Sequence, residues 1–191
     1  MVSNANGDGL KVKQLAIALS KLPVHPQNSA FLEQYQTEGN IAAKWLHLIH
    51  TLDDLSGKSV LDLGAGNGIL GHGAQLLGAN VIFVEVDKEA ASLCERLGET
   101  ICADVTKIKL PKVDIVIMNP PWGFQNKGAD RPFLEAAKAS AKVVHFMHSS
   151  HAQHLKSFQS VMQGTFRIPG KYTHHTSQNS ETSFTCYRWE A

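Results

Sequence analysis

The chain has few cysteines, few charged side chains and no long apolar run. Its 191 residues include three cysteines, Cys94, Cys102 and Cys186, and no C-x-x-C pair. This pattern indicates neither a disulfide framework nor a thiolate zinc site. Charged residues make up 18% and hydrophobic residues 43%, without repeats or low-complexity segments, which argues against disorder and against a coiled coil. No apolar stretch approaches the roughly 18 residues that span a bilayer, and the N-terminus lacks the features of a signal peptide. We therefore expect one compact domain over residues 1–191, in the cytoplasm.

Charge is unevenly distributed along the chain. The net charge is +1, but residues 1–104 carry 7 Lys and Arg against 12 Asp and Glu, whereas residues 105–191 carry 11 against 5. An acidic first part and a basic second part suit a protein that holds a cation on one side and a polyanion on the other. Chance segregation explains the charges equally well.

Apolar spacing predicts two helices before residue 58. Residues 12–22 show helical spacing over about three turns, and the prolines that follow are expected to stop this helix. Residues 41–52 repeat at i, i+4, i+7, i+8 and i+11, and Thr37 is placed to cap the start of this second helix.

From residue 58 onward, short apolar runs alternate with segments of helical spacing. Four β-branched-rich runs are expected to be strands buried on both faces, over residues 59–63, 81–86, 113–118 and 143–147. This rhythm predicts an α/β fold, a parallel sheet with helices on both sides. Residues 100–102 and 165–168 are weaker strand candidates, and residues 183–189 are expected to return along the edge of the sheet.

A glycine-rich turn follows the first of these strands. The segment Asp62-Leu63-Gly64-Ala65-Gly66-Asn67-Gly68 leads into a helix expected to begin near Ile69. Glycines allow a sharp turn and let a ligand approach the main chain. The NAD-binding pattern G-x-G-x-x-G/A requires a small residue where Ile69 stands, so the turn argues against a dinucleotide.

Acidic residues are expected at the carboxyl ends of successive strands. Glu85 ends the second strand, 23 residues after Asp62, and Asp104 follows the third candidate strand. An acid at the position of Glu85 is placed to accept hydrogen bonds from a ribose diol. An acceptor-rich site without a lysine near its glycine turn suits a positively charged nucleoside better than a phosphate. S-adenosylmethionine is such a molecule. The alternative is that these acids are solvated strand-end residues.

The sharpest motif is Asn119-Pro120-Pro121-Trp122, which directly follows a buried strand. The prolines make the turn rigid and supply carbonyl acceptors without N–H groups. We expect the Asn119 side-chain oxygen and the Pro120 carbonyl to bind both hydrogens of an amino group while Trp122 stacks on the attached plane. These bonds strengthen as the nitrogen becomes positive during attack on a methyl sulfonium, so no general base is needed. Taken alone, the motif is equally well explained as a turn with a core tryptophan.

Four histidines recur at every third residue, at positions 145, 148, 151 and 154. The first is expected on a strand and the last two on a helix, with no supporting carboxylate or cysteine nearby, so we do not expect them to converge on a metal. We predict no metal site, and a polar loop near enough to touch substrate phosphate.

The glycine turn and Asn119-Pro120-Pro121-Trp122 together resemble the class I S-adenosylmethionine-dependent methyltransferases that modify exocyclic or amide nitrogen. More narrowly, residues 32–37 (Leu-Glu-Gln-Tyr-Gln-Thr) and 130–134 (Asp-Arg-Pro-Phe-Leu) resemble the archaeal and eukaryotic methyltransferase-like protein 5 family, which methylates adenine N6 in small-subunit ribosomal RNA. The resemblance implies a Rossmann-like, doubly wound, mostly parallel seven-stranded sheet with its last strand antiparallel. It implies a core over residues 58–191 and an N-terminal helical extension over residues 1–52. It also implies S-adenosyl-L-methionine as cofactor, RNA as substrate and a small zinc-binding activator as partner.

The resemblance also implies roles for individual residues. Asn119, Pro120, Pro121 and Trp122 would form the catalytic set that holds the target base. The implied cofactor-binding residues are Gln34, Tyr35, Thr37, Asp62, Gly64, Gly66, Asn67, Ile69, Glu85, Asp104 and Val105. The chain departs from the family in having Trp122 for Phe and Glu85 for Asp. Residues 172–177 replace a lysine-rich stretch with histidines, so RNA affinity is expected to be weaker or to depend on a partner.

Other acceptors and a non-enzymatic role stay open from the sequence. The Asn-Pro-Pro-aromatic motif also serves glutamine-amide methylation in release factors, guanine-N2 methylation and DNA adenine methylation. Those relatives usually bring an extra recognition domain, for which this chain has no room, and residues 32–37 favour RNA adenine. A cofactor-binding ribosome-assembly factor without catalysis is the third possibility, although it need not preserve Asn119-Pro120-Pro121.

Overall fold

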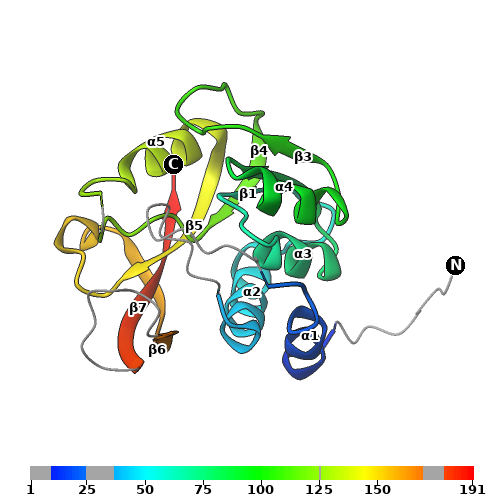
Figure 1. Cartoon of the computed structure of the whole chain (residues 1–191), viewed down its shortest axis with the longest axis horizontal. Helices are drawn as coiled ribbons and strands as arrows, with labels where there is room; N and C mark the ends of the chain where they lie inside the picture. The colour runs from blue at the N-terminus through cyan, green and yellow to red at the C-terminus, as the bar shows by residue number, and fades with distance from the viewer. Residues whose placement is uncertain (1–9, 25–36, 125, 170–178) are drawn as a thin grey trace, which may run out of the picture.

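The computed structural model describes residues 10–24, 37–124, 126–169 and 179–191 (Figure 1). These residues form α-helices, one short 3-10 helix and the strands of a single sheet. The helices are α1 (Val12–Leu19), α2 (Gly39–Asp53), α3 (Ile69–Leu76), α4 (Lys88–Glu95), α5 (Arg131–Ser140) and η1 (Gln153–Leu155). The strands are β1 (Ser59–Leu63), β2 (Asn80–Glu85), β3 (Thr100–Cys102), β4 (Val113–Met118), β5 (Ala141–Ser149), β6 (Gln159–Pro169) and β7 (Asn179–Glu190).

The sheet has seven strands in the order β3-β2-β1-β4-β5-β7-β6. Pairing is parallel from β3 to β5, and β7 is antiparallel to both of its neighbours. The predicted doubly wound sheet with an antiparallel last strand is therefore confirmed. The expectation that residues 183–189 lie at the edge was wrong. β7 lies between β5 and β6, and its side chains Phe184, Cys186 and Tyr187 are buried there, as is typical of an interior strand.

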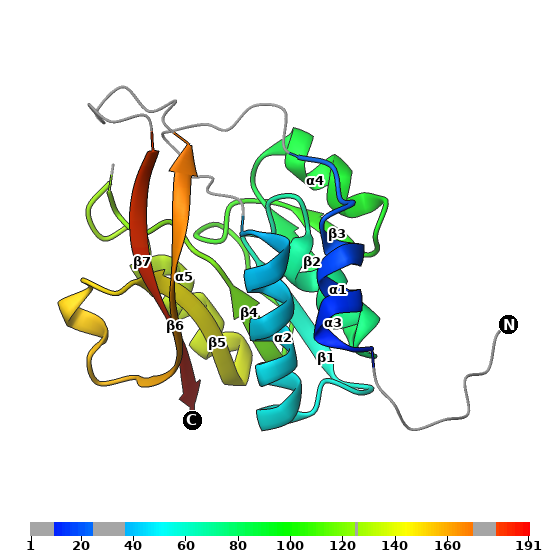
Figure 2. The same cartoon turned by 90° about the horizontal axis from the view of Figure 1, so that it is seen from below.

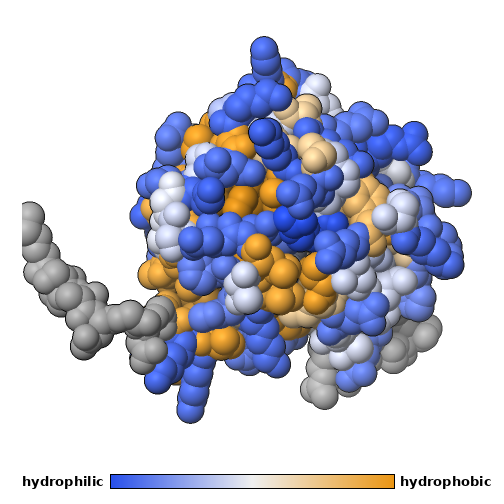
Figure 3. Space-filling view, turned by 180° about the vertical axis from the view of Figure 1, so that it is seen from behind, coloured by the Kyte–Doolittle hydropathy of each residue, from blue (hydrophilic) through white to orange (hydrophobic). Residues whose placement is uncertain are grey.

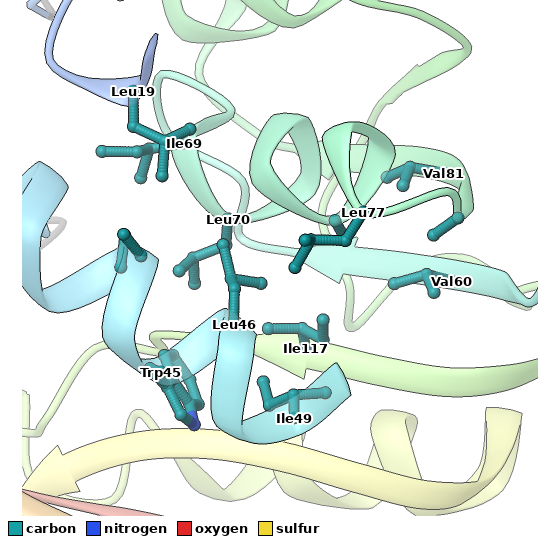
Figure 4. Close-up of a cluster of buried hydrophobic side chains, with 14 of the residues drawn as sticks. Leu19, Trp45, Leu46, Ile49, Val60, Ile69, Leu70, Leu77, Val81 and Ile117 are labelled. Atoms are coloured by element: carbon teal, nitrogen blue, oxygen red, sulfur yellow. The ribbon is translucent and has the colours of Figure 1, made fainter. Parts of the chain in front are cut away.

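Helices cover both faces of the sheet, as the alternation of runs predicted. Figure 2 shows α1, α2 and α3 packed against one face, while α5 packs against β4 and β5 on the other. In the close-up of Figure 4, Leu46 of α2 and Leu70 of α3 lie over Val60 of β1 and Ile117 of β4. All four side chains are at most 4% exposed. Burial on both faces explains why β1 and β4 are mostly apolar and do not alternate apolar with polar residues.

Both N-terminal helices differ in detail from the prediction. α1 ends at Leu19, and Ser20 to Leu22 form a turn, so the helix is shorter than three turns. α2 begins at Gly39 with Glu38 as its N-cap, and no side chain caps it. The prediction that Thr37 caps α2 was therefore wrong. Its hydroxyl is instead engaged by Asn119, 82 positions away in the sequence.

The C-terminal end of α2 is fixed to the sheet by Asp53. Asp53 Oδ2 accepts hydrogen bonds from His145 Nε2 of β5 at 2.7 Å and from Arg188 Nε of β7 at 2.9 Å. Its Oδ1 accepts a further bond from Arg188 Nη2 at 2.6 Å. Burial by itself raises the pKa of Asp53, but the hydrogen bonds and charges of Arg188 and His145 outweigh it and lower the pKa. For His145, burial is the larger effect and lowers the pKa.

The surface is mixed in polarity. On the face in Figure 3, apolar patches are separated by hydrophilic side chains. Within the described ranges, none of the helices has both the length and the apolarity that crossing a membrane requires.

Candidate cofactor and acceptor site

The two sequence motifs meet at the carboxyl ends of the neighbouring central strands β1 and β4. Asp62 of β1 pairs with Ile117 of β4, so Gly64 and Asn119 each lie two residues beyond that pair. The strand order reverses between β1 and β4, and open α/β sheets bind ligands in the crevice outside the carboxyl ends of strands at such a switch point. The structure thus brings the predicted cofactor turn and the predicted acceptor turn together.

The glycine turn is crowded on one side and open on the other. Gly64 and Gly66 have φ values of 75° and 57°, a region that favours glycine. A Cβ built on Gly64 would lie 3.0 Å from the ring of Phe133, whereas one built on Gly66 would meet no atom of the described residues within 4 Å. The turn therefore packs tightly against α5 and leaves room over Gly66 for a ligand.

Glu85 ties the end of β2 to this turn. Its Oε2 accepts a hydrogen bond from the Gly66 N–H at 2.7 Å, and its Oε1 accepts bonds from the Val86 and Asp87 N–H groups at 2.8 and 2.9 Å. A carboxylate offers about four acceptor positions, so these three bonds leave one for a ribose hydroxyl. The residue is only 6% exposed, so these bonds hold a largely buried carboxylate at the end of β2.

Asp62 holds the first turn of α3 against β1. Its Oδ2 accepts a hydrogen bond from the Gly71 N–H at 2.7 Å, while its Oδ1 is buried without a partner among the described residues. Burial raises the pKa of Asp62 to about 8, against the lowering effect of the Gly71 bond, and the charge of Glu85 adds to the rise. The residue is thus placed to support the turn, and it keeps one unused acceptor.

The remaining predicted cofactor residues lie in different surroundings. Asn67 donates from Nδ2 to the Pro23 carbonyl at 3.1 Å, which links the glycine turn to the segment after α1. The side chain of Ile69 packs in the apolar core beside Leu19 (Figure 4), so only its backbone is left to face a ligand.

The predicted residues after β3 and before α2 complete this set. Asp104 follows β3, and its Oδ1 accepts from the N–H and hydroxyl of Thr106 at 2.9 and 2.7 Å. Those two bonds lower the pKa of Asp104. Val105 is half-buried and packs against buried apolar side chains of the core. Gln34 and Tyr35 lie outside the described residues.

The acceptor turn has an ordered asparagine amide at its start. Asn119 Nδ2 donates to Thr37 Oγ1 at 3.2 Å, and Asn119 Oδ1 accepts from Trp122 Nε1 at 3.0 Å. Trp122 is only 8% exposed, so most of its ring is packed inside the protein. Its ring stacks on His148, with centroids 5.8 Å apart and planes at 20°. Phe124, two residues on, is 52% exposed.

A polar cluster behind Trp122 was missed by the sequence analysis. Asp130, 5% exposed, lies 2.7 Å from His154 Nε2 and 3.4 Å from His148 Nε2 through the same oxygen, Oδ2. The expectation that these histidines lie far from any carboxylate was wrong, because Asp130 is 18 positions before His148 in the sequence and reaches it through the fold. Burial alone raises the pKa of Asp130, but the two imidazoles lower it to about 2. Only the Asp130-Arg131-Pro132-Phe133-Leu134 motif pointed to this segment.

Comparison with known proteins identifies the family. Residues 41–158 match the methyltransferase small domain, which is more than half of the chain. The chain belongs to this methyltransferase family. A solved structure from Pyrococcus horikoshii, described as a candidate RNA methyltransferase, is 38% identical with a TM-score of 0.82, over 100% of this chain and 98% of that one. The rRNA N6-adenosine methyltransferase METTL5 of Danio rerio is 28% identical over 89% of this chain and 94% of its own length. Mettl5 of Drosophila melanogaster, of the same description, is 27% identical over 95% and 97%.

The enzyme is therefore a methyltransferase that uses S-adenosyl-L-methionine, as the motifs predicted. The residues present fit this cofactor on three observations. Among the described residues, space is open over Gly66, Glu85 has an acceptor position beyond its three backbone bonds, and the buried Oδ1 of Asp62 has no partner. The acidic side chain of Glu85 at the end of β2 also suits the positive sulfonium.

Proposed function

We propose that this methyltransferase transfers a methyl group to N6 of an adenine in small-subunit ribosomal RNA. The observation that carries the proposal is the Asn119 amide, oriented by Thr37 and Trp122 on the strand next to the glycine turn. The near full-length similarity to rRNA N6-adenosine methyltransferases supports the choice of acceptor. We also propose that the chain is a single methyltransferase domain, in which α1 and α2 form a helical extension that precedes the sheet.

The cofactor is assigned to the crevice between the ends of β1, β2 and β3. When bound, S-adenosylmethionine supplies the methyl group on its sulfonium. Glu85 would accept a ribose hydroxyl, Asp104 and Val105 would meet the adenine, and Gly64 and Gly66 would let the backbone approach the methionine part. Asp62 and Asn67 would hold this turn in place through Gly71 and Pro23. Gln34, Tyr35 and Thr37 are proposed to lie over the cofactor.

The acceptor nitrogen is assigned to Asn119 and Pro120. Asn119 Oδ1 has two lone pairs, of which one takes the Trp122 indole N–H, so one is left for an amino hydrogen. The Pro120 carbonyl is proposed to accept the other hydrogen. As the nitrogen attacks the methyl group it becomes positive, and both bonds strengthen, which lowers the barrier selectively. The extra proton then leaves to solvent, so no side-chain base is required.

The target base must be single-stranded or flipped to reach this turn. Asn119 is half-buried and Trp122 is almost fully buried, so a base inside a duplex cannot approach them. Trp122 is proposed to form one wall for the extruded base. The basic second part of the chain, with 11 Lys and Arg against 5 Asp and Glu, is proposed to attract the RNA backbone. A cytoplasmic location and a small zinc-binding activator also belong to the proposal.

The test is to identify the methylated product. Purified enzyme and methyl-labelled S-adenosylmethionine are incubated in parallel with undermodified small ribosomal subunits, a release factor and duplex DNA. We expect label in RNA as N6-methyladenosine. Asn119→Ala should lower the rate by about 10²- to 10³-fold while cofactor affinity stays within about twofold, because the lost contact acts in the transition state.

A matched control separates the site from general damage to the protein. Asn80→Ala removes an exposed asparagine at the start of β2, whose side chain donates one long bond of 3.4 Å to the Gly57 carbonyl, and it should leave the rate unchanged. Label in protein glutamine or in DNA would overturn the assigned acceptor. Full activity of Asn119→Ala would overturn the assigned catalytic role.

A further inference from the structure

A buried imidazole stands directly behind Trp122, and the proposed chemistry does not use it. His148 is 2% exposed, and neither of its ring nitrogens has a hydrogen-bond partner among the described residues. One face of its ring is stacked on Trp122. His148 Nε2 has a longer contact of 3.4 Å with Asp130 Oδ2. Burying a polar ring without a hydrogen bond is costly, so the position calls for a physical explanation.

Asp130 and His154 hold this imidazole from the side away from Trp122. Asp130 Oδ2 lies 3.4 Å from His148 Nε2, and the His154 ring meets the His148 ring edge-on at a centroid distance of 5.7 Å. Asp130 is itself fixed by its 2.7 Å contact with His154 Nε2. The three residues come from the start of α5, from β5 and from η1, so the cluster joins three separate elements behind the acceptor turn.

The distances favour a hydrogen-bonded cluster over a metal centre. The donor atoms of Asp130, His148 and His154 lie within 4.8 Å of one another, and zinc takes these ligand types. Two ligands that each lie 2.0–2.1 Å from a tetrahedral zinc are about 3.3 Å apart. The 2.7 Å contact between Asp130 and His154 is shorter than this and matches a direct charge-assisted hydrogen bond.

The cluster continues into the acceptor turn without a break. His148 stacks on Trp122, Trp122 donates to Asn119, and Asn119 donates to Thr37. A phenylalanine at position 122 would need only a ring of the right tilt. A tryptophan must also point one edge of its ring at Asn119, because its N–H has to reach Asn119 Oδ1 at 3.0 Å. A ring stacked on one face of the indole opposes rotation about χ2, which would turn that edge away.

We propose that His148, anchored by Asp130, is a positioning residue for methyl transfer. It fixes the ring of Trp122 and thereby the direction in which Asn119 presents its free acceptor lone pair. This inference rests on the proposed function for its kinetic consequence, but its structural consequence can be measured without any substrate.

The structural test follows the indole N–H of Trp122 by NMR. The chain has three tryptophans, so a ¹⁵N-labelled sample gives three indole N–H resonances, and Trp122→Phe identifies the one of interest. We expect His148→Ala to shift or broaden that resonance, and His148→Phe, which keeps a stacking ring, to return it close to its original position. His151→Ala is the matched control, since His151 is exposed and three residues away. An unchanged resonance in folded His148→Ala overturns the proposal.

The kinetic test separates positioning from folding. Misplacing a reacting group by about 1 Å costs up to about 10²-fold in rate, and we expect His148→Ala to lower kcat by about tenfold with cofactor affinity unchanged. Asp130→Asn should have a smaller effect in the same direction, and His148→Phe should recover most of the rate. If His148→Ala does not fold, His154→Ala serves instead, because His154 is 58% exposed and removes only the anchor of Asp130.

Two outcomes are kept apart by these measurements. If the wild-type enzyme methylates none of the offered acceptors, the proposed function fails, while the indole resonance still decides the positioning role. One equivalent of zinc in the purified protein that is lost in His148→Ala would overturn the proposal in favour of a metal site.

Discussion

Asp53→Ala is expected to lower the free energy of unfolding by about 3 kcal/mol. Asp53 accepts three hydrogen bonds from His145 and Arg188, whose side chains are 0% and 16% exposed. Removing one member of a buried ion pair costs about 3–5 kcal/mol, because the others are left without a partner. The lower value applies here because Arg188 keeps its 2.7 Å bond to Glu190 and has some contact with solvent.

The measurement is urea and thermal unfolding followed by circular dichroism. For a domain of this size, 1 kcal/mol corresponds to about 2–4 °C in Tm, so Tm should fall by about 6–12 °C. Glu190→Ala is the matched control, since it removes the other carboxylate bound to Arg188, one that is 59% exposed, and such pairs contribute about 0–1 kcal/mol. A loss below about 1 kcal/mol for Asp53→Ala would refute the view that this residue anchors α2.

Three further outcomes follow from the same contacts. Thr37→Val should lower kcat by about 3- to 10-fold with little change in cofactor affinity, as one neutral hydrogen bond is lost, whereas Thr37→Ser should keep the rate; equal losses in both would contradict the role of the hydroxyl. Glu85→Gln should weaken cofactor binding by about tenfold or more in calorimetry, because an amide cannot replace all three charge-assisted bonds to backbone N–H groups. Unchanged binding would refute the role of Glu85 in holding the glycine turn for the cofactor. The free energy of unfolding should fall as pH drops below about 6.5, because burial lowers the pKa of His145 and the unfolded chain then binds the proton more readily. Its slope against pH between pH 7.5 and 5.5 should be smaller in His145→Phe than in the wild type. Equal slopes would show that His145 is not the cause.

Much of the fold could be predicted because each strand carries a local signal. β1 and β4 are buried on both faces, so their sequences are mostly apolar, and glycine or proline follows within two residues of each strand end. The position of β7 could not be predicted in this way. Its placement between β5 and β6 depends on pairing with residues about 40 positions earlier in β5, such as Cys186 with Met147, and local sequence does not encode which neighbour a strand selects.

The residues of the candidate site also divide into those with a local sequence signal and those without one. The glycine turn and Asn119-Pro120-Pro121 were found because positive φ values and the absence of N–H groups are properties of single residues. The roles of Thr37, Asp130 and His148 were not found. Each acts through a partner that is distant in the chain, and a threonine near a helix start is more commonly a cap than a ligand of an asparagine amide.

The sequence by itself determined the alternation of strands and helices, the sharp turns at one edge of the sheet and the residue types that suit a cationic nucleoside and an amino group. These depend on backbone geometry and on burial, which act locally. Only the tertiary structure decided which side chains from distant parts of the chain contact these turns. Packing of α2, β5 and α5 around β4 brings Thr37, His148 and Asp130 to Asn119 and Trp122, and hydrogen bonds over such distances form only when the core has fixed the elements that carry them.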